Sequence, residues 1–137
     1  DSVTASSIST FGGNPLVARG AMAVLDYLLE HDLQANARTV GARLAAGLRT
    51  LAERHPMVGD IRGKGLMLGV ELIEPGTRAP AAAAAAALQE AARRGGLLVG
   101  KGGLYGNVLR IAPPLVLSQA EADEGLEILA RAFGAPD

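Results

Sequence analysis

The sequence predicts an α/β fold of the α+β type, in which helices pack on one face of a short, mainly antiparallel sheet. Three observations support this prediction. Segments that begin with a helix-capping residue and have apolar residues three or four positions apart alternate with short apolar runs. One of those runs, residues 66–73, is almost continuously apolar and is typical of a buried strand. The last two apolar runs lie close together around a glycine-rich loop, so they should pair antiparallel.

Two helices are expected in the first part of the chain. Residues 1–13 are rich in Ser, Thr and Gly and are expected to form a loop. Asn14 and Pro15 then begin a helix that extends to about Glu30, since Asn caps a helix and Pro fits its first position. After an expected Asp32 cap, a second helix runs to His55-Pro56. Its apolar stripe is Leu33, Ala37, Val40, Leu44, Leu48 and Leu51.

The second half of the sequence is predicted to form three strands and two helices. Residues 66–73 form the buried strand, and a helix follows from Pro80 to Arg94, ended by two glycines. Short strands are expected at 97–99 and 108–111, on either side of the glycine-rich loop. Residues 118–121, Ser-Gln-Ala-Glu, form a capping box that begins the last helix, with Ala122, Leu126, Leu129 and Phe133 on its apolar face.

Composition excludes several classes of function. The 137 residues carry a net charge of −1, which gives no electrostatic basis for binding nucleic acid. No apolar run is long enough to cross a bilayer, so no membrane association is expected. The chain has no cysteine, which excludes disulfides and is consistent with a cytoplasmic location. His31 and His55 have no neighbours at metal-ligand spacing, so no metal site is expected.

Two glycine-rich segments are interpreted as structural. Asp60–Gly65 is charged and glycine-rich, and we expect a tight turn with positive φ at its glycines rather than a ligand site. Gly95 and Gly100-Lys101 have the spacing of a phosphate-binding loop. However, Gly102 stands where a magnesium-binding Ser or Thr is required, which favours turn glycines.

Two other features are candidate binding sites. Ser9–Pro15 places hydroxyls and two glycines before a helix N-terminus, where Thr10 and free backbone N–H groups could bind an anion. The alternative is an ordinary helix cap. Arg110 lies in a short apolar strand, and an unpaired buried charge is costly. It therefore pairs either with a carboxylate of the protein or with a ligand carboxylate, and the residues themselves leave both open.

Three segments in order resemble the class III aminotransferases, which include ornithine, 4-aminobutyrate and alanine–glyoxylate aminotransferases. They are Ser9–Leu16 (STFGGNPL), Ile61–Met67 (IRGKGLM) and Leu109–Leu115 (LRIAPPL). Their order and separation are similar to those of the C-terminal third of the family, and the resemblance covers nearly the whole chain. It identifies the sequence as the C-terminal fragment of a pyridoxal phosphate (PLP)-dependent transaminase.

The resemblance implies a domain organisation and site roles. Residues 1–31 would be the interdomain loop and linking helix from a large domain outside this chain. Residues 32–137 would be the C-terminal small domain of the fold-type I aminotransferase fold. The Thr10 hydroxyl, helped by the backbone at Ser9, would bind the phosphate of PLP held by the neighbouring subunit of a homodimer. Arg110 would bind the substrate carboxylate, in a reaction that moves an amino group between an amino acid and a keto acid.

The resemblance also implies that the fragment alone is inactive. The family binds PLP as a Schiff base on a lysine that precedes the Thr10 segment, so no catalytic residue is expected in this chain. Lys64 and Lys101 are its two lysines and match other family positions. Two alternatives remain. One is a same-fold PLP aminomutase, racemase or decarboxylase, and the other is a non-catalytic α/β module that binds a small molecule.

Overall fold

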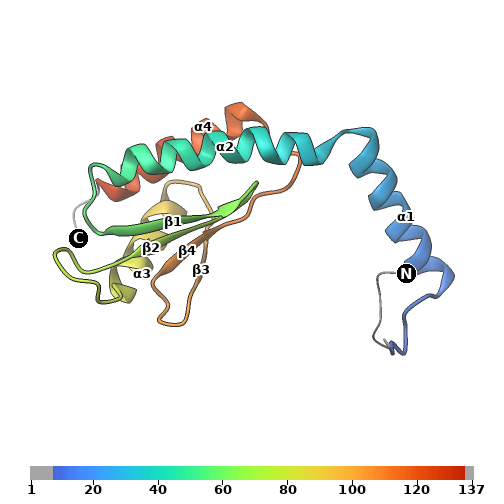
Figure 1. Ribbon diagram of the computed structural model, residues 1–137, viewed down its shortest axis with the longest axis horizontal. Helices are drawn as coiled ribbons and strands as arrows, with labels where there is room; N and C mark the ends of the chain where they lie inside the picture. Colours follow the sequence, from blue (N-terminus) through green and yellow to red (C-terminus); the bar gives the residue numbers. More distant parts are fainter. Residues whose placement is uncertain (1–7, 135–137) are drawn as a thin grey trace. The chain divides into compact units, whose positions relative to one another are not determined.

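A computed structural model describes residues 8–134, so the first seven residues of the expected N-terminal loop lie outside it. Within this described range, four helices and four strands follow one another (Figure 1). Contacts divide the chain into two compact units, Asp1–Leu33 and Gln34–Asp137. The elements are α1 (Pro15–Glu30), α2 (Leu33–Ala52), β1 (Val58–Lys64), β2 (Met67–Leu72), α3 (Ala82–Arg94), β3 (Gly100–Gly102), β4 (Val108–Ile111) and α4 (Gln119–Phe133).

The starts of α1 and α4 and the end of α3 lie where the local signals predict, whereas α2 ends at Ala52, before the expected His55-Pro56, and α3 begins at Ala82 and not at Pro80. Asn14 caps α1 through its side-chain oxygen, which accepts a hydrogen bond of 3.0 Å from the Val17 N–H. The capping box of α4 is also confirmed, because the Ser118 and Glu121 side chains each bond the other residue's backbone N–H. Helix α3 ends at Arg94 before Gly95-Gly96. These ends depend on contacts within one turn, which is why sequence predicts them well.

The four strands form one sheet in the order β1-β2-β4-β3, and every neighbouring pair is antiparallel. Pairing of the last two strands was predicted and is confirmed. The first of them begins at Gly100, however, and not at Leu97. Leu97 and Val99 pack against the core, but the ladder bonds are made by the Gly-Lys-Gly segment that follows.

Strand β1 corrects the interpretation of residues 60–65 as a tight turn. Asp60–Lys64 pairs with β2, and the turn itself is Gly65-Leu66, which joins Lys64 to its partner Met67. The positive φ expected at the glycines is present, at 142° for Gly63 and 57° for Gly65. The strand lacks a clear apolar alternation because it lies at a sheet edge and exposes most of its side chains.

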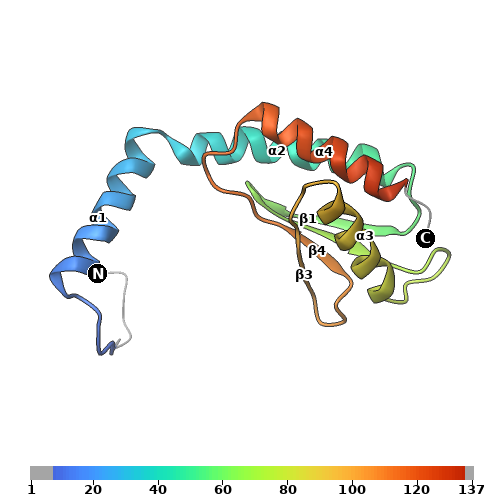
Figure 2. The same ribbon diagram turned by 180° about the vertical axis from the view of Figure 1, so that it is seen from behind.

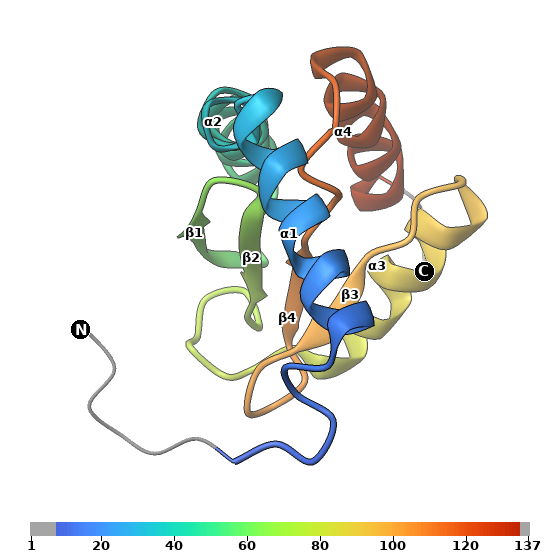
Figure 3. The same ribbon diagram turned by 90° about the vertical axis from the view of Figure 1, so that its right-hand side faces the viewer.

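Within residues 34–134, one face of the sheet packs against helices and the other does not. Alternate residues of β2 (Leu68, Val70 and Leu72) are buried, together with Leu109 of β4. Helices α2, α3 and α4 lie on the same side of the sheet (Figures 2 and 3). They complete a single core with Val40, Leu44, Leu48, Ala85, Leu88, Ala92, Ala122 and Leu129. The predicted α+β architecture, with helices on one face, is therefore confirmed.

Helix α1 differs from the other helices, because none of its residues is buried. Leu16 is 83% exposed and Leu29 is 67% exposed, although both belong to an apolar helix surface. Contiguous apolar surface of this kind marks an interaction site more often than a free surface. No helix within residues 8–134 is both long enough and apolar enough to span a membrane.

Candidate functional site

The segment before α1 is a compact turn that two polar side chains close. The Ser9 hydroxyl oxygen accepts a hydrogen bond of 3.0 Å from the Gly12 N–H, and the Asn14 amide donates one of 2.6 Å to the Phe11 carbonyl. A Cβ on Gly12 would lie 2.8 Å from the Ser9 Cβ, so this turn requires glycine there. Gly13 has a φ of 76°, which also favours glycine.

This turn can contribute to an anion site. Thr10 is exposed, and its hydroxyl has no hydrogen-bond partner among the residues that the structure describes. The Ser9 hydroxyl is already an acceptor but keeps its own proton to donate. No Lys or Arg lies between Ile8 and Pro15. The donors therefore fit one side of a phosphate site, and the neutralising charge must come from elsewhere.

Arg110 lies on the face of the sheet that the helices leave open. Its neighbours Leu109 and Ile111 point to the core side, because side chains alternate along a strand. Arg110 is exposed, so the expectation of a buried guanidinium was wrong. Within residues 8–134 it forms no ion pair and no side-chain hydrogen bond. The alternative of a protein carboxylate partner therefore finds no support in the described part of the chain.

Strand register places a second arginine in the same row of the sheet as Arg110. Gly69 of β2 is the partner of Arg62 on β1 and of Arg110 on β4. Gly100 of β3 pairs with Arg110 on the other side. The row across the open face is thus Arg62, Gly69, Arg110 and Gly100. Arg110 therefore has a glycine as its ladder partner on each side.

The two arginines of this row differ in how their charge is compensated. The Arg62 guanidinium contacts Asp60 at 2.9 Å and also contacts Glu71. Hydrogen bonds to Asp60, and then to Glu71, raise the pKa of Arg62 above its usual value. Asp60 and Arg62 were predicted only as parts of a glycine-rich turn, and Glu71 was assigned no role. Their proximity follows only from strand register. Asp60 and Arg62 are two residues apart and lie on the same face of β1, and Glu71 is the ladder partner of Asp60.

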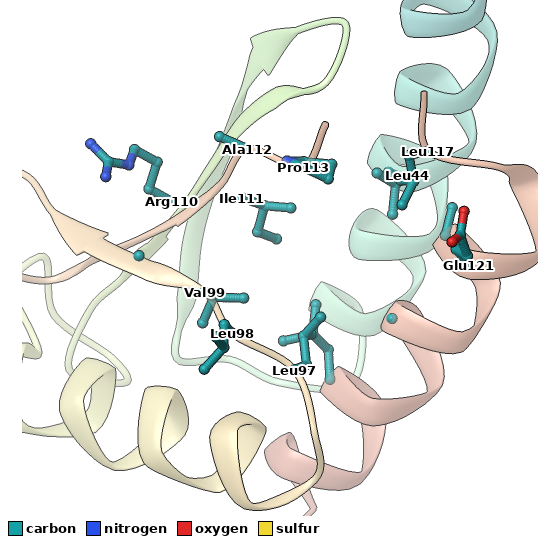
Figure 4. Close-up of a pocket in the computed structure, with 14 residues that line it drawn as sticks. Leu44, Leu97, Leu98, Val99, Arg110, Ile111, Ala112, Pro113, Leu117 and Glu121 are labelled. Carbon is teal, nitrogen blue, oxygen red and sulfur yellow. The ribbon is translucent and has the colours of Figure 1, made fainter. Parts of the chain in front are cut away.

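A pocket beside Arg110 is apolar and does not contain its charged group. The pocket has a volume of about 190 Å³ and lies between the β3–β4 pair and α4. Figure 4 shows Ile111 pointing into it and the Arg110 guanidinium pointing away. Its carboxylate, Glu121, belongs to the capping box, and hydrogen bonds from the Ser118 backbone and hydroxyl lower the Glu121 pKa. This pocket therefore lacks free acid–base groups.

The remaining candidates for chemistry are few. Lys64 and Lys101 are exposed on the two edge strands, β1 and β3. No cluster of three or more His, Asp or Glu side chains that could hold a metal ion occurs within residues 8–134. The polar features that stand out are therefore the Ser9-Thr10 turn and the open sheet face with Arg110.

Comparison with known proteins identifies the family of the chain. A model of the aminotransferase class-III family matches residues 2–133. A 5-aminovalerate aminotransferase from Pseudomonas putida is 42% identical over 124 residues, which are 90% of this chain and 29% of that protein. An alanine/serine racemase from Pyrococcus horikoshii is 38% identical over 97% of this chain and 28% of its own length.

A solved structure supports the same relationship. The structure of an amine transaminase from an uncultivated Pseudomonas species, in its PLP-bound form, superposes with a TM-score of 0.83 at 38% identity. The match covers 96% of this chain and 30% of that one. The chain belongs to the class-III aminotransferase family, and it spans somewhat under a third of the length of these relatives.

Proposed function

We propose that the full protein carrying this chain is a PLP-dependent transaminase, which moves an amino group between an amino acid and a keto acid. The observation that carries the proposal is Arg110, an arginine on an open sheet face without a carboxylate partner in residues 8–134. Family membership supports it, as does the chemistry of the relatives' substrates. 5-Aminovalerate, alanine and serine, which the relatives' names mention, all carry a carboxylate.

Arg110 would bind and orient the substrate by its carboxylate. A guanidinium offers two parallel N–H donors that match the two carboxylate oxygens. Arg110 is exposed on the open sheet face, and both of its ladder partners are glycines. This contact fixes one end of the substrate, and so determines which amine reaches the reacting centre. Arg110 orients the substrate in this role and moves no proton, because a guanidinium offers only N–H donors and stays charged in proteins.

Thr10 and Ser9 would hold the cofactor. The Thr10 hydroxyl and the Ser9 hydroxyl proton can donate to a phosphate oxygen, and the turn that carries them is closed by its own hydrogen bonds. When bound, PLP accepts and returns the amino group and stabilises the electron pair released at the substrate carbon. We propose that the turn serves the neighbouring subunit's cofactor in a homodimer. Its one-sided donor set requires other groups to complete the site.

The first part of the chain would link two domains. We propose that residues 1–31 connect a large domain to the small domain of residues 32–137. The exposed apolar surface of α1 supports this, since that surface needs a partner in the full protein. A cytoplasmic location remains a prediction from the absence of cysteine.

The test is the substitution Arg110→Lys in the full-length enzyme, measured on matched donors. Pentylamine is 5-aminovalerate with a methyl group in place of the carboxylate, and isopropylamine is related to alanine in the same way. Loss of the bidentate contact should cost roughly 1.5–3 kcal/mol, or about ten- to a hundredfold in kcat/KM, for the carboxylate-bearing donors. The two amines should change little, and PLP affinity should stay the same.

Thr10→Val is the matched variant with the opposite pattern. It removes a hydroxyl without changing side-chain size, so PLP affinity should fall while the preference for carboxylate-bearing donors persists. Equal losses on both kinds of donor for Arg110→Lys, together with a lower melting temperature, would contradict the carboxylate role of Arg110.

A racemase is the second candidate, because an alanine/serine racemase is among the relatives. A racemase interconverts the two enantiomers of one amino acid and needs no keto acid. A transaminase consumes a keto acid and releases another. Incubating the enzyme with L-alanine alone distinguishes them: D-alanine formation without an acceptor favours the racemase. Family membership favours both enzymes over a non-catalytic binding module.

A further inference from the structure

Gly100 occupies a strand position that does not itself require glycine. It lies in β3 and is not among the glycines with positive φ. A glycine within a strand weakens it, since it has no side chain to pack and loses more chain entropy on folding. Some other feature must therefore explain why no side chain is present at this position.

The explanation lies in the neighbouring arginine. The three atoms nearest to a Cβ built on Gly100 all belong to Arg110: Nε at 3.2 Å, Nη2 at 3.3 Å and Cβ at 3.5 Å. Two guanidinium nitrogens thus lie over Gly100, where any other residue would place its side chain. The first two distances are closer than ordinary van der Waals contact, so a methyl group would displace the guanidinium by a few tenths of an ångström.

Gly102 provides the contrast within the same strand. It faces the same side of the sheet as Gly100, two residues further along, and pairs with Val108. It also has no positive φ, and a Cβ there would meet nothing within 4 Å. The two glycines therefore share a strand, a face and a backbone conformation. They differ in what a side chain would contact.

We propose that Gly100 is a positioning residue for Arg110: its missing side chain sets where the guanidinium lies, and thereby which carboxylates it reaches. This inference rests on the proposed carboxylate-binding role of Arg110. The guanidinium is the flexible end of an exposed side chain, so displacing it costs little folding free energy. A larger residue at this position should therefore change substrate selection and leave stability nearly unchanged.

The test uses Gly100→Ala and Gly100→Val in the full-length holoenzyme, with Gly102→Ala and Gly102→Val as controls. The donors are 4-aminobutyrate, 5-aminovalerate and 6-aminohexanoate, which differ in the distance between amine and carboxylate, and pentylamine, which has no carboxylate. Because misplacement by about 1 Å costs about a hundredfold, Gly100→Ala should raise KM about three- to tenfold for the preferred carboxylate donor, and Gly100→Val more.

The pattern across donors identifies the cause. Gly100 variants should change the ratio of kcat/KM values among the three acids and leave pentylamine unaffected, while Gly102 variants change neither. In an Arg110→Lys background, Gly100→Ala should have no further effect, since its target is gone. Melting temperatures of all four glycine variants should stay close to that of the parent.

Three results would overturn the inference in different ways. If Arg110→Lys loses carboxylate donors selectively but the Gly100 variants do not, Arg110 keeps its role and Gly100 has none. If Arg110→Lys shows no selective loss, the role proposed for Arg110 fails and the inference fails with it. A lower melting temperature with equal losses on acids and pentylamine would also overturn it, because that pattern indicates a structural role.

Discussion

Asn107 illustrates how much a single residue can contribute outside any binding site. It is the buried polar residue of the described chain, at 2% exposure. Its amide donates a hydrogen bond of 2.8 Å to the Leu72 carbonyl, and its backbone carbonyl accepts one from the Leu72 N–H. The end of β2 is thereby fixed to the start of β4. Sequence placed Asn107 in a loop but could not predict this role, because its partner lies 35 residues away.

The ion pair between α2 and α4 predicts a pH dependence of stability. Arg43 contacts the two Asp123 oxygens at 2.5 and 2.8 Å. Its hydrogen bonds lower the pKa of Asp123 below the usual value. A carboxyl group with a lowered pKa in the folded state stabilises the fold above its unfolded pKa, and this contribution is lost as pH falls through the folded pKa.

We therefore expect Asp123→Asn to lower the melting temperature slightly at neutral pH, because the exposed pair contributes little. The difference from the parent should disappear when the pH falls below the folded pKa of Asp123. Thermal denaturation of both chains across the acid range measures it. Glu124→Gln is the control, since Glu124 has no ion pair within the described residues. A difference that is constant with pH would exclude the ion pair as its cause.

At the scale of elements, predictions succeeded where an element's own residues carry a cap, a glycine stop or an apolar pattern, and failed where they do not. The starts of α1 and α4 follow from their caps, and the end of α3 follows from the glycines after it, all within one turn. Strand β1 was missed and β3 was misplaced by three residues, because both consist largely of glycine and charged residues. Such segments become strands through backbone pairing with β2 and β4, the next strands along the chain, and their own residue types do not indicate that pairing.

Gly41 is a helix glycine whose purpose appears only when α2 and the β1–β2 turn are considered together. A Cβ on Gly41 would overlap the carbonyl oxygen of Gly65, which is backbone and cannot move aside easily. We expect Gly41→Ala to destabilise the fold by about 1–3 kcal/mol, despite the higher helix propensity of alanine.

Gly47→Ala is the matched control in the same helix. A Cβ on Gly47 would overlap the methyl groups of Leu126, and a side chain can rotate away more easily than backbone. Urea denaturation of the two variants should therefore show the larger loss for Gly41→Ala. Equal losses would mean that the close approach to the turn is not a significant constraint.

At the scale of the whole molecule, we expect residues 33–137 to fold without the part that precedes them. The core cluster draws on α2, α3, α4 and the sheet, and no residue of α1 is buried. A chain that begins at Leu33 should therefore melt within a few degrees of the 137-residue chain and give the same tryptic core. A large drop in melting temperature, or loss of cooperative unfolding, would show that α1 contributes to this core.

The candidate site was predictable in part, because some of its residues belong to local motifs and others are brought together only by the pairing of strands. Thr10 and Arg110 belong to local motifs that sequence reveals, and their roles remain predictions. The row of Arg62, Gly69, Arg110 and Gly100 could not be read from the chain, because it joins four strands through register. Register depends on the alternation of buried residues in β2 and on the two-residue turn at Gly65-Leu66.

The two edges of the sheet have a consequence for self-association. An exposed edge strand offers unpaired backbone groups to any other chain in an extended conformation. Here β1 carries Asp60, Arg62 and Lys64 along its length, and β3 is three residues long. Charge at one edge and brevity at the other make both poor templates for intermolecular strand pairing. The chain should thus have little tendency to form fibrous aggregates through the edges of its sheet, even with one sheet face uncovered.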